Sequence, residues 1–158
     1  KYKITDKNLL SSNNLFAYYK DLSSDFPLLY LEDPFSDDDW NAWNNLTIRI
    51  PQVSLIVGDD LTATNPLRLS KAFDKKAITG IIIKPNQIGT VTEALRVVEI
   101  ARKKGLKIIV SHRSGETNDD FIADFAVAVG ADYVKFGALV QKERIAKYNR
   151  LLQIESQL

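Results

Sequence analysis

The chain has 158 residues, which fits one domain, and its 45% hydrophobic and 26% charged residues are ordinary for a globular protein. Its formal net charge of +1, without basic clusters, gives little support to nucleic-acid binding, and the absence of cysteine excludes disulfides and thiolate metal sites. No stretch approaches the roughly 18 apolar residues of a membrane span, and no signal-peptide pattern opens the chain, so we expect a cytoplasmic protein. Because the first residue is Lys1 and methionine is absent, we expect the chain to be part of a longer product.

The first part of the chain alternates helical segments with short apolar runs. We predict a helix at 13–23, followed by the run LLYL, which stops at Glu32. A short helix at 39–46 precedes a second run, SLIVG, which stops at Asp59. Each run has the length of a strand, and each ends at a polar side chain.

The middle of the chain continues this pattern. A helix is predicted after the Asn-Pro pair at 65–66, and the third run, GIII, stops at Lys84. The clearest helix follows, because Thr90 and Glu93 have the spacing of a capping box and Gly105 marks the end of an apolar stripe at helical spacing.

Two more runs complete the series. The run KIIV leads into the tetrapeptide Ser-His-Arg-Ser at 111–114, and the pair YV ends at Lys135. Between them, the segment 119–129 is nearly apolar on all sides, which predicts a helix packed on more than one side. A last helix is predicted at 143–155.

The runs recur about every 25 residues, the length of one strand, one helix and two loops, which indicates a parallel α/β sheet. Two architectures fit, an open doubly wound sheet or part of a (β/α)8 TIM-type barrel. The chain has no GxGxxG or GxxxxGK[ST] loop, and its functional groups come from every strand end, so we predict a partial barrel with about five of the eight strands. No linker divides the chain, so residues 1–158 form one partial barrel domain.

Each polar strand-end residue also has a purely structural interpretation. Glu32 could start a turn before proline, and Asp59 could cap a helix or shape a loop. Lys84 could extend to water from the end of its strand, and His112, the only histidine, is more often structural than catalytic. The combination changes these odds, because such groups on one rim need a shared metal and anion.

The residue types suggest a reaction class. Neighbouring carboxylates without cysteine favour a hard cation such as Mg²⁺. Arg113 and Ser114 offer donors suited to a phosphate or a carboxylate. A lysine among other cations can be neutral near neutral pH and accept a proton. The hypothesis is metal-assisted proton abstraction next to the carboxylate of an anionic substrate.

Five strings in order, LEDPFSDDDW, GDDLTATNP, KPNQIGT, SHRSGET and KERIAKYNRLLQIE, resemble the carboxyl-terminal barrel domain of the enolase family, the phosphopyruvate hydratases of glycolysis. The resemblance is close from Tyr30 to Leu158 and looser from Lys1 to Leu29. It implies a lyase that dehydrates 2-phospho-D-glycerate to phosphoenolpyruvate and water in the cytoplasm.

The resemblance also implies a role for each strand-end residue. Glu32 and Asp59 would bind Mg²⁺, and Lys84 would be the base that removes the proton alpha to the carboxylate, since a lysine base beside Mg²⁺ is characteristic of the enolase superfamily. The remaining members of the expected substrate site are Ser111, His112, which would lie near the phosphate and the departing hydroxyl, Arg113 and Ser114, which would hold the phosphate, and Lys135, which would hold the carboxylate.

The chain departs from the family pattern in what it lacks. Enolases take a third metal carboxylate from the preceding strand and an acid glutamate from further upstream, and no position here matches either. We therefore expect this chain to be inactive by itself. The open barrel would expose sheet edges, so we also expect poor solubility, and we expect the full-length protein to be a homodimer.

Two alternatives stay open. Another barrel of the same superfamily, such as an acid-sugar dehydratase or a racemase, would share the proton abstraction, although the Arg-Ser pair fits a phosphate that those substrates lack. A non-catalytic relative would use the same domain as a binding or structural module.

Overall fold

The computed structural model describes residues 1–5 and 8–158. Its centre is a parallel sheet whose strand order, β3-β4-β5-β6-β7, is the order of the chain. The strands are β3 (Tyr30–Glu32), β4 (Leu55–Gly58), β5 (Gly80–Ile83), β6 (Lys107–Ser111) and β7 (Tyr133–Lys135). A doubly wound sheet would reverse its strand order at a switch point. This sheet has no reversal within the described residues, so the prediction of a partial (β/α)8 barrel is confirmed.

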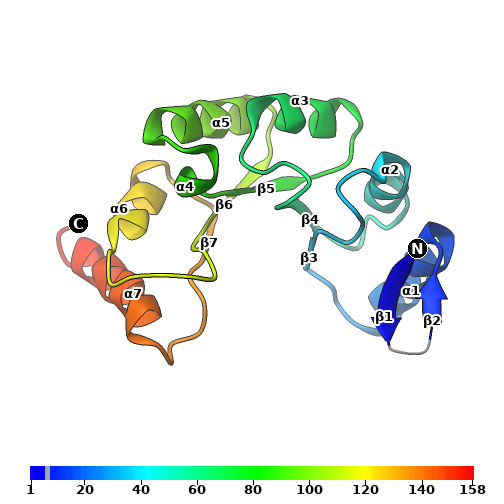
Figure 1. Ribbon diagram of the computed structural model, residues 1–158, viewed down its shortest axis with the longest axis horizontal. Helices are drawn as coiled ribbons and strands as arrows, with labels where there is room; N and C mark the ends of the chain where they lie inside the picture. The colour runs from blue at the N-terminus through cyan, green and yellow to red at the C-terminus, as the bar shows by residue number, and fades with distance from the viewer. Residues whose placement is uncertain (6–7) are drawn as a thin grey trace.

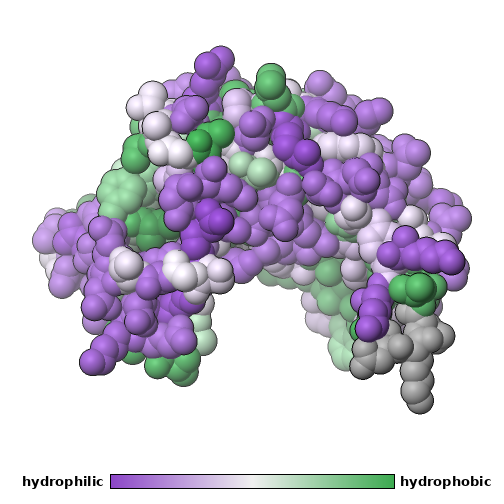
Figure 2. Space-filling model, in the orientation of Figure 1, coloured by the Kyte–Doolittle hydropathy of each residue, from purple (hydrophilic) through white to green (hydrophobic). Residues whose placement is uncertain are grey.

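The molecule has the shape of an arch, with helices outside the curved sheet (Figure 1). α3 and α5 lie along its top, α1 and α2 at the amino-terminal leg, and α6 and α7 at the carboxyl-terminal leg. The helices are α1 (Ser12–Asp25), α2 (Trp40–Arg49), α3 (Pro66–Asp74), α4 (Pro85–Ile88), α5 (Val91–Lys103), α6 (Phe121–Ala128) and α7 (Lys142–Glu155). The space-filling view shows a mostly hydrophilic face, with hydrophobic residues on the lower, inward parts of both legs (Figure 2).

Alternating side chains of the strands build two apolar layers. Ile81 and Ile83 pack in the large core between the sheet and the helices, together with side chains such as Trp43. Ile82 points to the other face, where it forms a small cluster with three more strand residues and Tyr30. Burying an isoleucine side chain contributes about 1.5–3 kcal/mol, so each of these isoleucines helps to hold its strand in the sheet.

Local signals place most helix ends correctly. At the start of α5 the Thr90 hydroxyl accepts the Glu93 N–H at 3.2 Å, as the capping-box pattern predicts. Gly105 follows with φ +70°, the left-handed conformation that glycine adopts most easily. The short helix predicted at 39–46 instead runs to Arg49, and α4 was not predicted.

The helix predicted at 119–129 is shorter and less enclosed than expected. It covers Phe121–Ala128, and the Phe121 and Val127 side chains are exposed. Ala123, Phe125 and Ala126 form its buried side.

An antiparallel hairpin, β1 (Tyr2–Thr5) and β2 (Asn8–Leu10), precedes α1 and was not predicted. Tyr2 anchors it to the loop after β3, since its hydroxyl donates to Asp39 at 2.7 Å and its ring packs edge-on against Phe35. Its strands are too short to give a readable alternation of apolar and polar residues.

Candidate active site at the carboxyl ends of the strands

The parallel sheet brings the polar strand-end residues to one rim. Glu32, Ser111 and Lys135 are the last residues of β3, β6 and β7, while Asp59 and Lys84 directly follow β4 and β5. Because parallel strands end on the same side, these carboxylates, lysines and the serine all lie along the carboxyl-terminal rim of the sheet.

Lys84 and Asp59 form a nearly enclosed ion pair. The Lys84 Nζ lies 2.5 Å and 2.8 Å from the two carboxylate oxygens of Asp59, and the side chains are only 13% and 11% exposed. The backbone N–H of Lys84 donates to the Thr64 hydroxyl at 3.0 Å, which fixes the start of the segment after β5. The sequence hypothesis placed this lysine among cations, whereas the structure places it against a carboxylate.

A second ion pair spans the mouth of the arch. The Nζ of Lys135 lies 2.6 Å from Oε1 of Glu32, and the other oxygen of Glu32 accepts a hydrogen bond from the Tyr30 hydroxyl at 2.7 Å. Burial and the Glu32 carboxylate raise the pKa of Tyr30, so its hydroxyl stays a donor. Glu32 and Asp59, the two carboxylates predicted as metal ligands, are thus each paired with a lysine ammonium.

Asp33 is a member of the site that sequence reasoning missed. Its backbone has φ +41°, and its carboxylate accepts the backbone N–H groups of Asp59 at 2.9 Å and Asp60 at 2.7 Å. Burial raises the pKa of Asp33, while the two N–H donors oppose this effect. The only signal was an aspartate before Pro34, since aspartate tolerates left-handed backbone and accepts local N–H groups.

Asp33, Asp59 and Asp60 together form an acidic group. One oxygen from each lies within 4.8 Å of the other two, a spacing that could suit a metal ion. Glu32 is outside this group and contacts Lys135 instead. The structure therefore brings Asp59 together with two aspartates that were not predicted as ligands.

The tetrapeptide after β6 is held mainly through its backbone. The His112 N–H donates to the Lys135 carbonyl at 2.9 Å, which extends the pairing of β6 and β7. The Ser111 hydroxyl is buried and donates to the His112 carbonyl at 2.9 Å, so it is already engaged. The carbonyl of Ser114 accepts a hydrogen bond from Arg144 at 2.9 Å.

The Arg113 side chain lies beside a cavity of about 340 Å³. Its guanidinium donates to the Asn86 side chain at 3.3 Å, and Glu116 also lines the space. No hydrogen bond or ion pair in the described part of the chain joins the side chains of His112, Arg113 or Ser114 to Glu32, Asp59 or Lys84. The rim thus has a carboxylate–lysine part and a separate His-Arg-Ser part.

A family description for the enolase C-terminal TIM barrel domain matches residues 1–158. The chain belongs to the enolase family. Enolases of three organisms show the similarity: the chain is 46% identical over 153 residues to that of Helicobacter pylori (strain HPAG1), 48% over 156 residues to that of Aeropyrum pernix, and 47% over 156 residues to that of Sulfurisphaera tokodaii.

These alignments cover 97% to 99% of this enolase-family chain but only 36% to 37% of the relatives' length. The resemblance seen in the sequence is thereby confirmed at the level of the family. Among the described residues of this enolase-family chain, no helix is long and apolar enough to cross a bilayer.

Proposed function

We propose that this chain carries the base-bearing part of an enolase site, which dehydrates 2-phospho-D-glycerate to phosphoenolpyruvate with Mg²⁺. The observation that carries the proposal is the Lys84–Asp59 pair at the strand ends of an enolase-family half-barrel. It combines a nearly buried amine, which can act as a base, with a carboxylate, which can hold a metal ion.

Glu32 and Asp59 fit the proposed metal. Their donor atoms are carboxylate oxygens, which Mg²⁺ prefers, and each already attracts a lysine ammonium at 2.5–2.6 Å. Asp33 supports this fit, because it holds the backbone at Asp59 and Asp60. When bound, Mg²⁺ would stabilise the negative charge that develops on the substrate carboxylate.

Lys84 is the proposed base. Its Nζ would take the proton from the carbon alpha to the substrate carboxylate, which it can do only after its ammonium has left Asp59 and lost its own proton. A different cation that binds Asp59 would therefore release Lys84 from its ion pair, so that Lys84 can act as the base. The Lys84 side chain is only 13% exposed, so little water surrounds the amine.

The other cations would bind the anionic substrate. Lys135 would exchange Glu32 for the substrate carboxylate, and Arg113 would hold the phosphate from its position beside the cavity, with Ser114 and His112 next to it. After proton removal, the carbon–oxygen bond to the departing hydroxyl breaks, and the electron pair of the broken C–H bond forms the new double bond. The acid that protonates this hydroxide is not among the residues we assign to the chain.

The reaction can be tested in the complete protein in which the chain occurs. We expect phosphoenolpyruvate, followed by its ultraviolet absorbance, to form from 2-phosphoglycerate in the presence of Mg²⁺ and not after its removal by a chelator. Turnover of an acid sugar or racemisation of a carboxylate substrate, without phosphoenolpyruvate, would replace the proposal by the superfamily alternative. Absence of all three activities would favour a non-catalytic module. Homodimerisation and a cytoplasmic location are parts of the same proposal.

A further inference from the structure

Arg144 of α7 grips the tetrapeptide that follows β6. Its Nη1 donates to the Arg113 carbonyl at 2.8 Å and its Nη2 to the Ser114 carbonyl at 2.9 Å. Nη1 also contacts Nδ1 of His112. One guanidinium thus fixes three consecutive residues of the proposed phosphate-binding segment.

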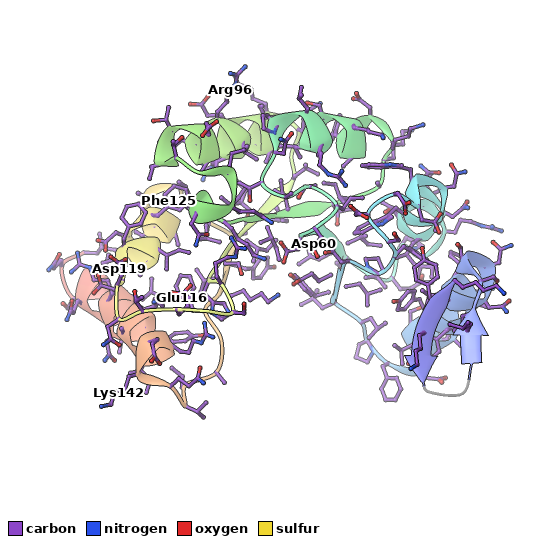
Figure 3. All side chains as sticks on the ribbon, in the orientation of Figure 1. Asp60, Arg96, Glu116, Asp119, Phe125 and Lys142 are labelled. Carbon is purple, nitrogen blue, oxygen red and sulfur yellow. The ribbon has the colours of Figure 1, made fainter. Side chains whose placement is uncertain are left out.

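Lys147, one turn further along α7, holds the next part of the same loop. It is fully buried, its Nζ lies 2.9 Å from Glu116, and it donates to the carbonyls of Thr117 at 2.9 Å and Asp119 at 2.7 Å. The other oxygen of Glu116 accepts the Arg113 N–H at 2.7 Å. Figure 3 shows Glu116 and Asp119 on this loop, on the side of the arch that carries α6 and α7.

Gly137, after β7, leaves the space in which Arg144 reaches His112. It has φ +82°, and a Cβ at this position would lie 3.0 Å from both Arg144 Cδ and His112 Cε1. Tyr148 of α7 donates to the Gly137 carbonyl at 2.8 Å, which fixes this backbone against the helix. The contact between Arg144 and His112 therefore depends on three parts of the chain: α7, the segment after β6 and the segment after β7.

The position of the Arg144 guanidinium beside Nδ1 bears on which nitrogen of His112 carries the proton. A guanidinium has only donors and stays protonated, so the nitrogen it faces must be an acceptor. In a neutral imidazole with Nδ1 accepting, the proton is on Nε2. In the described part of the chain, Nε2 has no hydrogen-bond partner, so its N–H is available to a ligand.

We propose that Arg144 is a positioning residue that fixes His112 as the neutral, Nε2-protonated tautomer, so that His112 presents one N–H donor to an anionic oxygen. The use of this donor on a phosphate-bearing substrate rests on the proposed function. The tautomer does not, because the contacts that set it are made without a substrate.

The tautomer of His112 is directly measurable. We would label histidine with ¹⁵N in the complete protein in which the chain occurs, assign the His112 ring signals, and record long-range ¹H–¹⁵N spectra at a pH of about 8, above the ordinary histidine pKa of about 6.5. We expect one protonated and one unprotonated nitrogen, with the proton on Nε2. A proton on Nδ1, protons on both nitrogens or exchange-averaged signals would overturn the proposal without any variant.

A matched pair of variants tests the part played by Arg144. Arg144→Met removes the donors and keeps most of the stem, and we expect loss of the single-tautomer pattern, with the two nitrogen shifts moving towards each other. Arg150→Met is the control, because Arg150 also lies on α7 and also holds a neighbouring element, through its bidentate contact with Asp124. We expect it to leave the His112 signals unchanged.

The variants separate positioning from general damage. Amide spectra would establish that each variant is folded before its histidine signals are compared. An unchanged Nε2-protonated pattern in folded Arg144→Met, or an equal loss in Arg150→Met, would overturn the proposal. Since no turnover is measured, failure here and failure of the enolase proposal remain distinguishable.

Discussion

The Nζ of Lys135 lies 2.6 Å from Oε1 of Glu32, although β7 and β3 are the two outermost strands of the sheet. The contact exists because the sheet curves, which brings the carboxyl ends of its outer strands towards each other across the arch (Figure 1). The Lys135 ammonium thereby pairs with Glu32, a carboxylate that we propose as a metal ligand. Cation binding at this rim then requires exchange of one positive charge for another.

Removal of this lysine should strengthen Mg²⁺ binding. In Lys135→Met the Glu32 carboxylate loses its competing cation. Since partly exposed ion pairs are worth about 0.2–1 kcal/mol, we expect the Mg²⁺ dissociation constant to fall by roughly 1.4- to fivefold. Isothermal titration calorimetry of the complete protein in which the chain occurs would measure this dissociation constant. Lys107→Met is the control, because Lys107 pairs with Asp132 near the opposite, amino-terminal ends of the strands. Equal affinity in the wild type and Lys135→Met would contradict the exchange of cations.

Lys84→Arg should separate the ion pair from the proposed base. An arginine can keep a cation against Asp59, but it stays protonated and cannot accept the substrate proton. We expect the rate of phosphoenolpyruvate formation in the complete protein to fall by about 10²–10⁴-fold, the usual contribution of a positioned base. Lys71→Arg is the control, since Lys71 lies over the Trp40 ring on the outer surface. Retention of more than a tenth of the wild-type rate would exclude Lys84 as the base.

Gly137→Ala should destabilise the protein more than Gly105→Ala. Both glycines have positive φ, +82° and +70°, which costs an alanine about 1–2 kcal/mol. Only the new Cβ at Gly137 would also meet Arg144 and His112, because nothing lies within 4 Å of a Cβ at Gly105. Denaturant titrations would give the free energy of unfolding of each variant. The difference between the two losses measures the packing of the new Cβ against Arg144 and His112. Equal losses would mean that the loop moves aside freely.

The link between α6 and α7 should weaken in acid. The Arg150 hydrogen bonds hold the pKa of Asp124 below its usual range, so the folded state binds the Asp124 proton less readily than the unfolded state. The stability that this pair contributes is present above the ordinary aspartate pKa of about 3.9 and is lost as the pH falls below it. The thermal unfolding temperatures of the wild type and Arg150→Met should differ at neutral pH, and this difference should shrink as the pH falls below the ordinary aspartate pKa. A difference that persists in acid would show that packing of Arg150, not its charge, is responsible.

In the part of the chain that the structure describes, β7 pairs only with β6, and its free edge should promote self-association of the isolated chain. Tyr133 and Val134 are exposed on this edge, and an uncovered strand offers free N–H and C=O groups to another chain. We expect Val134→Lys to reduce aggregation, measured by light scattering, because a charged edge pairs less readily. Val91→Lys, at an exposed position on α5, is the control. A stable monomer in the wild type would show that the edge is protected in another way.

The sequence predicted the strands and their order better than the contacts between their ends. Apolar runs such as GIII identify buried strands, and the polar residue that follows each run marks the end where the site lies. The partner of Lys84 was not predictable in this way, because it depends on how neighbouring loops turn after the strands. The roles of Asp33 and Arg144 depend on a left-handed backbone and on the docking of a helix, and neither leaves a periodic signal.

The strand order has a consequence for how the molecule folds. Each described strand of the parallel sheet pairs with the next strand along the chain, roughly 25 residues away, so these contacts are non-local and such pairing is intrinsically slow to form. The Glu32–Lys135 contact is different, because it joins residues 103 positions apart. We expect it to form only when the last strand has docked, so that the two ends of the rim meet at the completion of folding.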